Sequence, residues 1–396
     1  MSFSGLRCVE NLERILYTYP QSLILRSINT MKINIDKDLL LDNLTVASRF
    51  VSNRFSSVPS LQGILFETKD KHINLYATNL TSFFHTKIKN PTTEEKKIVF
   101  DPKKVMEFLS LLTPGIVELD IEDSQLVIRK DKTKGTFSLI NAEDFPYPPI
   151  VKEKEEKIKT DVLKKHLPLV LFAASSDDTR PVLNGVNFLT QDDEIALVAT
   201  DGFRLSLLKM KKEDSIPQML VPKGFLEEVV RLSKEEKEMG LRFSEKEKVI
   251  SFTFGDTTVY SRLITGDFPP FEKVIPSESK TKAVIEKDEF LRNIRIVSVF
   301  AREVSNIALL SFGKDGITMS PKTERDDQNS TLQDADVEGP PQKVAFNFKF
   351  IIDFLMHAPD KKKIIIEVLR PDAPVVFKIE GNKDFLHVIM PVRIQT

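Results

Sequence analysis

One pattern of apolar and polar residues occurs three times along the chain, and this repeat constrains the fold more than any other feature. Segments 35–51, 158–174 and 285–301 each place apolar residues at positions i, i+4, i+7 and i+11 of one helical face. This spacing indicates an amphipathic helix with one buried stripe. Three such copies are improbable by chance, so we expect three structural units of one kind.

Further copies define the content of each unit. Segments beginning at Phe100, Leu220 and Phe346 each predict a strand end, a turn and a second helix, followed by an alternating strand. The segments "FSLINAEDFP" from Phe137 and "YSRLITGDFP" from Tyr260 match nearly position for position. We therefore predict an α+β fold in which each unit packs two helices on antiparallel sheet.

The repeat also predicts where the units begin and end. Charge-rich segments at 151–159 and 276–284 have the composition of solvated linkers between units. Residues 1–30 have no counterpart in the repeat, and we treat them as an extension of unknown role. The predicted units are residues 31–153, 154–276 and 277–396.

Composition excludes several classes of protein. The formal net charge is −1, so the whole molecule has no strong attraction to DNA or to acidic membranes. The single cysteine, Cys8, excludes internal disulfides and cysteine-rich zinc sites and fits a reducing cytoplasm. No apolar run approaches the ~20 residues of a membrane helix. We expect a cytoplasmic protein with no membrane association.

No motif in the sequence indicates catalysis. The five histidines show no metal-binding spacing, and phosphate-binding or nucleophile motifs are missing. Asp201 would be the candidate catalytic acid of a hydrolase built on such a repeat, yet its role in a turn explains it equally well. We predict no catalytic residue, no metal and no cofactor, and keep the hydrolase as a remote alternative.

The stretch "LVATDGFRLSL" at 197–207 raises the question of what its turn presents. Asp201-Gly202 between two apolar runs is a strong hairpin signal, because a type I′ turn needs positive φ at both central residues. Phe203, Arg204 and Leu205 follow directly, where small polar residues would suffice. The segment "LYATNLTSFFHTKI" from Leu75 aligns with it without a gap.

Four segments together resemble one protein family. They are "RPVLNGVNF" at 180–188, "VATDGFRLSL" at 198–207, "GDFPPFEKVIP" at 266–276 and "VIMPVRI" at 388–394. They are similar to the bacterial DNA polymerase III beta subunit, the replicative sliding clamp. The resemblance covers residues 31–396 in order, with the same three-unit layout.

The resemblance implies a ring. Clamps of this family are head-to-tail homodimers whose six units surround double-stranded DNA without reading its sequence, with the helices lining the hole. It implies a processivity factor without a catalytic site, and as partners the DNA polymerase III alpha subunit, the clamp loader and other proteins with a clamp-binding motif. The alternative is a monomeric scaffold that binds peptides but never encircles DNA.

The resemblance also implies a pocket between the second and third units that accepts short peptides with apolar anchors. Phe203 stands where many relatives have histidine, and Val392 replaces a common methionine. The alternative is that Leu205, Val274 and Val388 are ordinary residues of the hydrophobic core and bind no peptide. The positions matching the pocket are Leu183, Thr200, Gly202, Arg204, Leu205, Pro269, Val274, Val388, Met390, Pro391, Val392, Arg393 and Ile394.

Two smaller sets of residues match other functional positions of the family. Arg54 matches a basic loop position associated with DNA contact. Phe137 and Leu139 match one side of the ring interface, and Val299 and Phe300 match the other. Their mutual burial would give the apolar seam typical of obligate interfaces.

Overall fold

The computed structural model describes residues 30–52, 58–191, 193–211, 216–234, 236–302, 306–322, 329–360 and 362–393. Almost all of the predicted extension, 1–30, lies outside them. The chain forms two compact units. The first takes the chain up to Leu75 together with Ile88–Phe145, and the second takes Tyr76–Lys87 together with the chain from Pro146 onward.

The first unit is a mixed unit of helices and antiparallel sheet. Its strands lie in the order β1-β6-β7-β8-β5-β2-β3. Two helices accompany them, with short 3-10 turns at Ser48–Phe50 and Pro59–Gln62. The elements are β1 (Met31–Asp36), α1 (Lys37–Ala47), β2 (Ile64–Lys69), β3 (His72–Thr78), β5 (Lys96–Phe100), α2 (Pro102–Leu111), β6 (Ile116–Ile121), β7 (Gln125–Lys130) and β8 (Thr133–Ile140).

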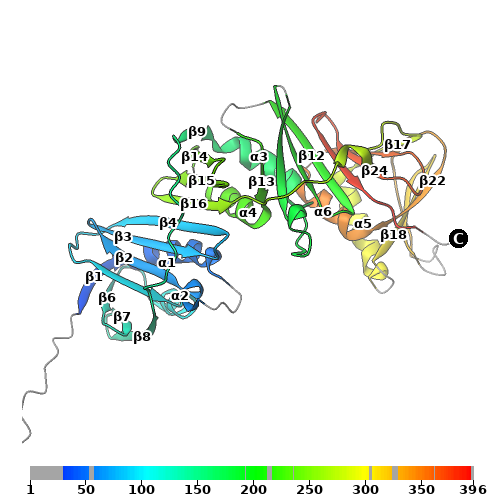
Figure 1. The fold of residues 1–396 in the computed structure, drawn as a ribbon. Helices are drawn as coiled ribbons and strands as arrows, with labels where there is room; N and C mark the ends of the chain where they lie inside the picture. Colours follow the sequence, from blue (N-terminus) through cyan, green and yellow to red (C-terminus); the bar gives the residue numbers. More distant parts are fainter. Residues whose placement is uncertain are drawn as a thin grey trace, which may run out of the picture. The chain divides into compact units, whose positions relative to one another are not determined.

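The second unit holds three sheets and four helices among its described residues (Figure 1). Their strand orders are β4-β16-β15-β14-β9, β13-β10-β11-β12-β25-β24-β23-β17-β21 and β20-β19-β18-β22. The helices are α3 (Thr160–Leu171), α4 (Lys223–Leu232), α5 (Lys287–Ala301) and α6 (Phe348–His357). The strands are β4 (Ser82–Lys89), β9 (Glu156–Lys159), β10 (Gly185–Gln191), β11 (Glu194–Thr200), β12 (Arg204–Lys211), β13 (Met219–Pro222), β14 (Glu238–Ser244), β15 (Val249–Phe254), β16 (Thr257–Arg262), β17 (Thr281–Glu286), β18 (Ile307–Gly313), β19 (Gly316–Pro321), β20 (Thr331–Gln333), β21 (Asp336–Glu338), β22 (Gln342–Asn347), β23 (Lys363–Val368), β24 (Val375–Ile379) and β25 (Phe385–Ile389).

The first helix of each repeat begins in the same way. The backbone N–H groups of Lys37, Thr160 and Lys287 donate to the carbonyls of Gly115, Lys237 and Lys362, at 3.0, 3.1 and 3.2 Å. Each hydrogen bond ties the start of the first helix to the residue just before the strand that follows the second helix of the same repeat, and so satisfies one of the free donors of a helix N-terminus. The predicted repeat of two helices on antiparallel sheet is confirmed.

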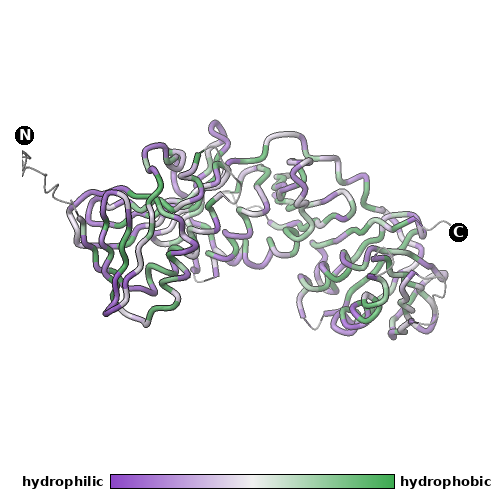
Figure 2. The backbone as a smooth tube through the Cα atoms, turned by 90° about the horizontal axis from the view of Figure 1, so that it is seen from below, coloured by the Kyte–Doolittle hydropathy of each residue, from purple (hydrophilic) through white to green (hydrophobic). Residues whose placement is uncertain are grey.

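The predicted helical stripes are buried as expected. Leu44 and Ala47 of α1, Leu167 of α3, and Ile294 and Val297 of α5 are all fully buried. Figure 2 shows hydrophobic and hydrophilic positions alternating along the strands, the pattern of sheets with one face in the core. The unit boundaries at 153 and 276 stay a prediction. No helix within the described residues is long and apolar enough to cross a membrane.

The nine-stranded sheet joins the second and third repeats. Strand β12 of the second repeat pairs antiparallel with β25 of the third, with Leu205 opposite Val388 and Ser206 opposite His387. Since successive side chains point to opposite faces, Leu205 and Val388 share one face, and Ser206 and His387 share the other. This shared sheet supports the site described next.

Candidate functional site

The turn between β11 and β12 is held by its own side chains. Thr200 Oγ1 donates to the carbonyl of Arg204 at 2.6 Å and accepts from the N–H of Gly202 at 3.0 Å. Asp201 Oδ1 accepts from the N–H groups of Phe203 and Arg204, both at 2.9 Å. The predicted hairpin is confirmed, because Thr200 pairs with Leu205 across the two strands.

The type of this turn differs from the prediction. Gly202 has φ +90°, but Asp201 is not among the described residues with positive φ, so the turn is not type I′. The reason is the Asp201 carboxylate, which caps two backbone N–H groups and allows a longer turn. Gly202 is still needed, because its φ is one that other residues rarely adopt.

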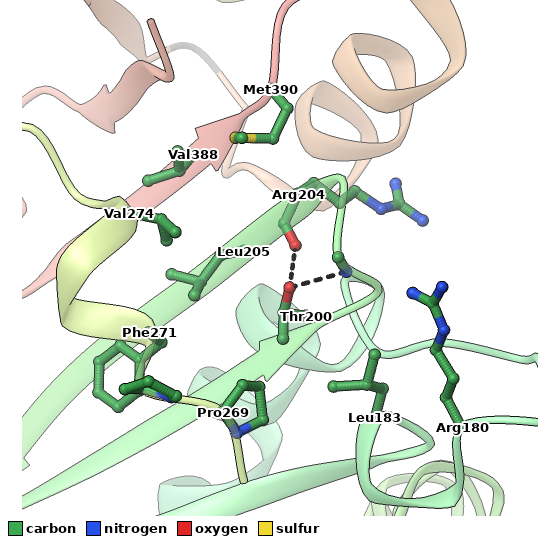
Figure 3. Close-up of a pocket in the computed structure, with 12 residues that line it drawn as sticks. Arg180, Leu183, Thr200, Arg204, Leu205, Pro269, Phe271, Val274, Val388 and Met390 are labelled. Atoms are coloured by element: carbon green, nitrogen blue, oxygen red, sulfur yellow. Dashed lines mark hydrogen bonds between the residues drawn. The ribbon is translucent and has the colours of Figure 1, made fainter.

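Beside this turn lies an apolar cavity of about 280 Å³ (Figure 3). Its walls come from the turn, from the short helix η3 (Pro181–Leu183), from the chain through η4 (Phe271–Val274) and from β25. It is lined by Arg180, Leu183, Thr200, Gly202, Arg204, Leu205, Pro269, Pro270, Phe271, Val274, Val388 and Met390.

The floor and the rim of the pocket differ in burial. Leu205 and Val388 are 3% and 1% exposed and belong to a core cluster that includes Phe271, so the floor is also ordinary core. Val274 and Met390 are each 37% exposed at the rim, so for Val274 the core alternative is wrong. A packed floor with an adaptable methionine at the rim suits several related apolar occupants.

Most of the residues predicted for the pocket line it, but its C-terminal edge does not follow the prediction. Pro391, Val392 and Arg393 are described and do not line the cavity. Strand β25 ends at Ile389, and the N–H of Val392 donates to the carbonyl of Ala345 at 2.8 Å, which commits this segment to β22. Ile394 lies outside the described residues.

Three lining residues were missed. Arg180, Pro270 and Phe271 lie within or beside the motifs that pointed to the site, yet none was assigned to it. Phe271 and Val274 are the ends of a 3-10 turn, where residues i and i+3 share one side, so a lining Val274 could have indicated Phe271.

The guanidinium of Arg204 is engaged by the protein itself. Its Nε lies 3.0 Å from Asp201 Oδ2, and its Nη1 lies 2.7 Å from Asp353 Oδ2 on α6. Its Nη2 donates to the carbonyl of Phe172 at 3.1 Å. The side chain is 10% exposed, so this charge is largely withdrawn from water and neutralised by two carboxylates.

Beneath the pocket, on the other face of the sheet, His387 is completely buried. Its Nδ1 lies 2.8 Å from Ser206 Oγ, and its ring stacks on Phe354 with centroids 5.1 Å apart. Burial, and then the charge of Arg204, hold the pKa of His387 well below its ordinary value. We therefore assign His387 a structural role as a neutral imidazole.

Phe203 extends the apolar surface beyond the cavity. It is 61% exposed, and its ring stacks on Phe350 of α6 with centroids 6.4 Å apart. The N–H of Met390 donates to the carbonyl of Phe203 at 2.8 Å, so the exposed ring stands directly beside the rim.

None of the other predicted site residues that the structure describes is among the residues lining the pocket. Phe137 and Leu139 are half-buried on β8 of the first unit, where Phe137 packs edge-on against Phe108 with centroids 5.6 Å apart. Val299 and Phe300, on α5 of the second unit, are 61% and 42% exposed. Arg54 lies outside the described residues.

The geometry around Asp201 does not favour catalysis. Its carboxylate accepts two backbone N–H groups and an ion pair from Arg204, so its oxygens are committed to structure. Within the described ranges, no group of His, Cys, Asp and Glu side chains could hold a metal ion. The site can exclude water from an apolar segment, and it offers no reacting group.

Comparison with known proteins gives matches along nearly the whole chain. Three family models match, described as the DNA polymerase III beta subunit N-terminal domain at residues 31–149, central domain at 157–270 and C-terminal domain at 272–393. The beta sliding clamps of Staphylococcus aureus and Bacillus subtilis are each 27% identical to it; each match covers 92% of this chain, with 99% and 100% of the relative.

Solved structures agree with these matches. The sliding clamp of Bacillus subtilis and the beta subunit of Thermotoga maritima both superimpose with a TM-score of 0.83 at 25% identity. Each match covers 92% of this chain and 100% of the other. A clamp from Pseudomonas aeruginosa, 21% identical with a TM-score of 0.82, was solved bound to griselimycin and supports the fold.

Proposed function

This chain belongs to the DNA polymerase III beta subunit family, and we propose that its apolar pocket receives short peptide segments of polymerases and other replication proteins. Members of the family are sliding clamps. The chain is accordingly a DNA sliding clamp and processivity factor, and it is a non-catalytic subunit of the polymerase. The predictions of family, fold and non-enzymatic role are confirmed.

The observation that carries the proposal is the construction of the pocket. Its floor is part of the buried core, its rim is an exposed methionine and valine, and its lining is mostly apolar. A peptide that inserts apolar side chains gains from burial in such a pocket. The polymerase III alpha subunit and the clamp loader are the proposed occupants.

We further propose that two chains close head to tail into a ring. Head-to-tail contacts either close into a ring or grow into a filament, so a dimer needs both surfaces buried. The exposed Val299 and Phe300 are one candidate surface, and the half-buried Phe137 and Leu139 are the other. Joining them would remove apolar area from water on both sides of the seam.

The proposed ring holds duplex DNA by topology more than by affinity. A net charge of −1 gives no strong overall attraction to phosphates, and tight phosphate contacts would slow sliding. Arg54 stays a candidate for a local DNA contact. We place the protein in the cytoplasm, where replication partners and a reduced Cys8 are both expected.

Retention on DNA tests the ring. The protein is loaded onto a nicked circular duplex by its clamp loader, and the circle is then cut once. We expect rapid loss on cutting, because a ring slides off the new ends. The control is Phe300→Asp, which should give monomers by native mass and no retention on the circle. Equal retention of the wild-type chain on circle and line would instead support the non-encircling scaffold.

A further inference from the structure

Arg204 joins elements that belong to different repeats. Its guanidinium contacts Asp201 in the turn, the carbonyl of Phe172 at the end of α3 and Asp353 of α6, at 3.0, 3.1 and 2.7 Å. The first two belong to the second repeat, and Asp353 belongs to the third. A single side chain therefore fastens the pocket turn to the helix of the neighbouring repeat.

The same guanidinium points away from the cavity that the residue helps to line. In Figure 3 it extends to the side opposite Val274 and Val388. Its carbon Cζ lies 4.8 Å from the ring centroid of Phe350 and 5.5 Å from that of Phe172, so aromatic rings cover it. Arg204 thus meets the cavity through the part of the residue near its backbone, and its charge is directed into the protein.

A contact that holds the turn in place matters because the turn lies at the end of the β12–β25 ladder. The pairing of β12 with β25 ends with Arg204 opposite Ile389, and beyond it one hydrogen bond remains, from the N–H of Met390 to the carbonyl of Phe203. Both walls of the pocket mouth therefore lie where backbone pairing ends. A contact that fixes the turn here lowers the cost of ordering the mouth when a peptide binds.

We propose that Arg204 and Asp353 are a positioning pair that holds the Thr200–Leu205 turn against α6 and keeps the pocket mouth preformed. In this account Arg204 makes no ion pair with the bound peptide. The inference rests on the proposed peptide-binding function and adds to it the residues that shape the site. Asp353 becomes functionally important although it lines no part of the cavity.

The test measures binding of the purified polymerase III alpha subunit to the immobilised full-length clamp. A charge-assisted hydrogen bond contributes about 1.5–3 kcal/mol, and Asp353 is 43% exposed, so we expect Asp353→Ala to weaken binding by about tenfold. Asp353→Glu should restore most of the affinity. The double variant Arg204→Ala with Asp353→Ala should bind no more weakly than Arg204→Ala alone.

The matched control is Glu367→Ala, which removes a carboxylate 2.7 Å from Lys378 in the same sheet, away from the pocket. It should bind the alpha subunit as the wild-type chain does. Hydrogen exchange at the amide of Met390 gives a second measurement, and it should be faster in Asp353→Ala while the melting temperature stays close to that of Glu367→Ala.

The outcomes separate this inference from the function on which it rests. If the wild-type clamp fails to bind the alpha subunit, the peptide-binding function itself is wrong. If the wild-type clamp binds and Asp353→Ala binds equally well, only the positioning pair is overturned. Additive losses in the double variant would also overturn it, because they would mean that Arg204 and Asp353 affect binding independently.

Discussion

The same turn is built twice in the second unit, once in the pocket and once at Thr78–Ser82 between β3 and β4. In the second copy Thr78 Oγ1 donates to the carbonyl of Ser82 and accepts from the N–H of Leu80, both at 2.8 Å. Asn79 Oδ1 accepts from two backbone N–H groups, as Asp201 does in the pocket turn. The backbone construction is therefore not what makes the pocket turn functional.

The residues beneath the two turns differ in size. Leu205 faces Val388 across β12 and β25, whereas Phe83 faces Tyr260 across β4 and β16. These pairs stand at equivalent places in two antiparallel ladders, directly after each turn. Two aromatic rings occupy volume that leucine and valine leave open, so the pocket depends on side-chain size at two floor positions.

The two turns also differ in charge. Arg204 stands where the other turn has Ser82, and Asp201 stands where it has Asn79. Only the pocket turn therefore carries an ion pair that reaches another repeat. The same backbone arrangement therefore forms a plain connection at Thr78–Ser82 and one wall of an apolar cavity at Thr200–Leu205.

Filling the pocket floor should have the largest effect. Leu205→Phe copies Phe83 into the pocket, and the larger ring should weaken binding of the polymerase III alpha subunit by roughly 100-fold, because it removes space that the peptide needs. Binding is measured by surface plasmon resonance, with melting temperature as the check on folding. Phe83→Leu is the converse control and should bind normally. Unchanged binding by Leu205→Phe would mean that the peptide does not reach this floor.

Removing the side chain that caps each turn should lower the free energy of unfolding by different amounts at the two turns. Asn79→Ala loses two hydrogen bonds to the backbone and should lower the free energy of unfolding by about 1 kcal/mol. Asp201→Ala also leaves Arg204 without one partner, so we expect a loss of about 2–3 kcal/mol. Urea unfolding measures both, and Asp201→Asn isolates the ion pair. Equal losses of free energy of unfolding in the two alanine variants would mean that the ion pair of Asp201 does not distinguish the two turns.

Relieving the strained positive φ of Leu80 by substitution should have a smaller effect and should stabilise the fold. Leu80 has φ +72°, where a residue with Cβ is strained, while the equivalent Gly202 at φ +90° is not. Leu80→Asn should raise the free energy of unfolding by up to about 1 kcal/mol, because asparagine tolerates this conformation better. Leu39→Asn, at an exposed helical position, is the control and should give no gain. A destabilised Leu80→Asn would show that the leucine packs usefully.

Each ladder contains a histidine, fully buried at His387 and half-buried at His85, and the titration of His85 should give the smallest effect. Burial lowers the pKa of His85 from its ordinary 6.5 to about 4. As pH falls below about 6.5, the unfolded chain binds a proton that folded His85 does not, so stability is lost between about pH 6.5 and 4. Between about pH 7 and 5, melting temperature should fall a few degrees less in His85→Phe than in the wild-type chain. An equal fall in melting temperature with pH in His85→Phe and in the wild-type chain would contradict this role of His85.

The sequence predicts those features whose residues are close together along the chain, and it does not predict contacts between distant residues. The helical stripes and the hairpin of "VATDGFRLSL" are continuous in the sequence, so spacing and the repeat predict them, whereas the pocket was implied only by the resemblance to the family. Asp353 could not be linked to Arg204, because the two are 149 residues apart and no motif connects them. Val392 does not line the cavity: Pro391 is consistent with the end of the strand, but nothing in "MPVRI" shows that the chain then turns to Ala345.

The ladder between β12 and β25 cannot form until the C-terminal strand has been synthesised. Ser206 and His387, which meet across it, are 181 residues apart, so β12 leaves the ribosome long before its partner strand exists. Until then β12 is an open sheet edge, the kind of surface on which nascent chains aggregate. Until β25 has been made, Leu205 has no Val388 opposite it and the pocket floor is incomplete. Peptide binding at this pocket, as proposed above, would therefore require that translation has passed β25.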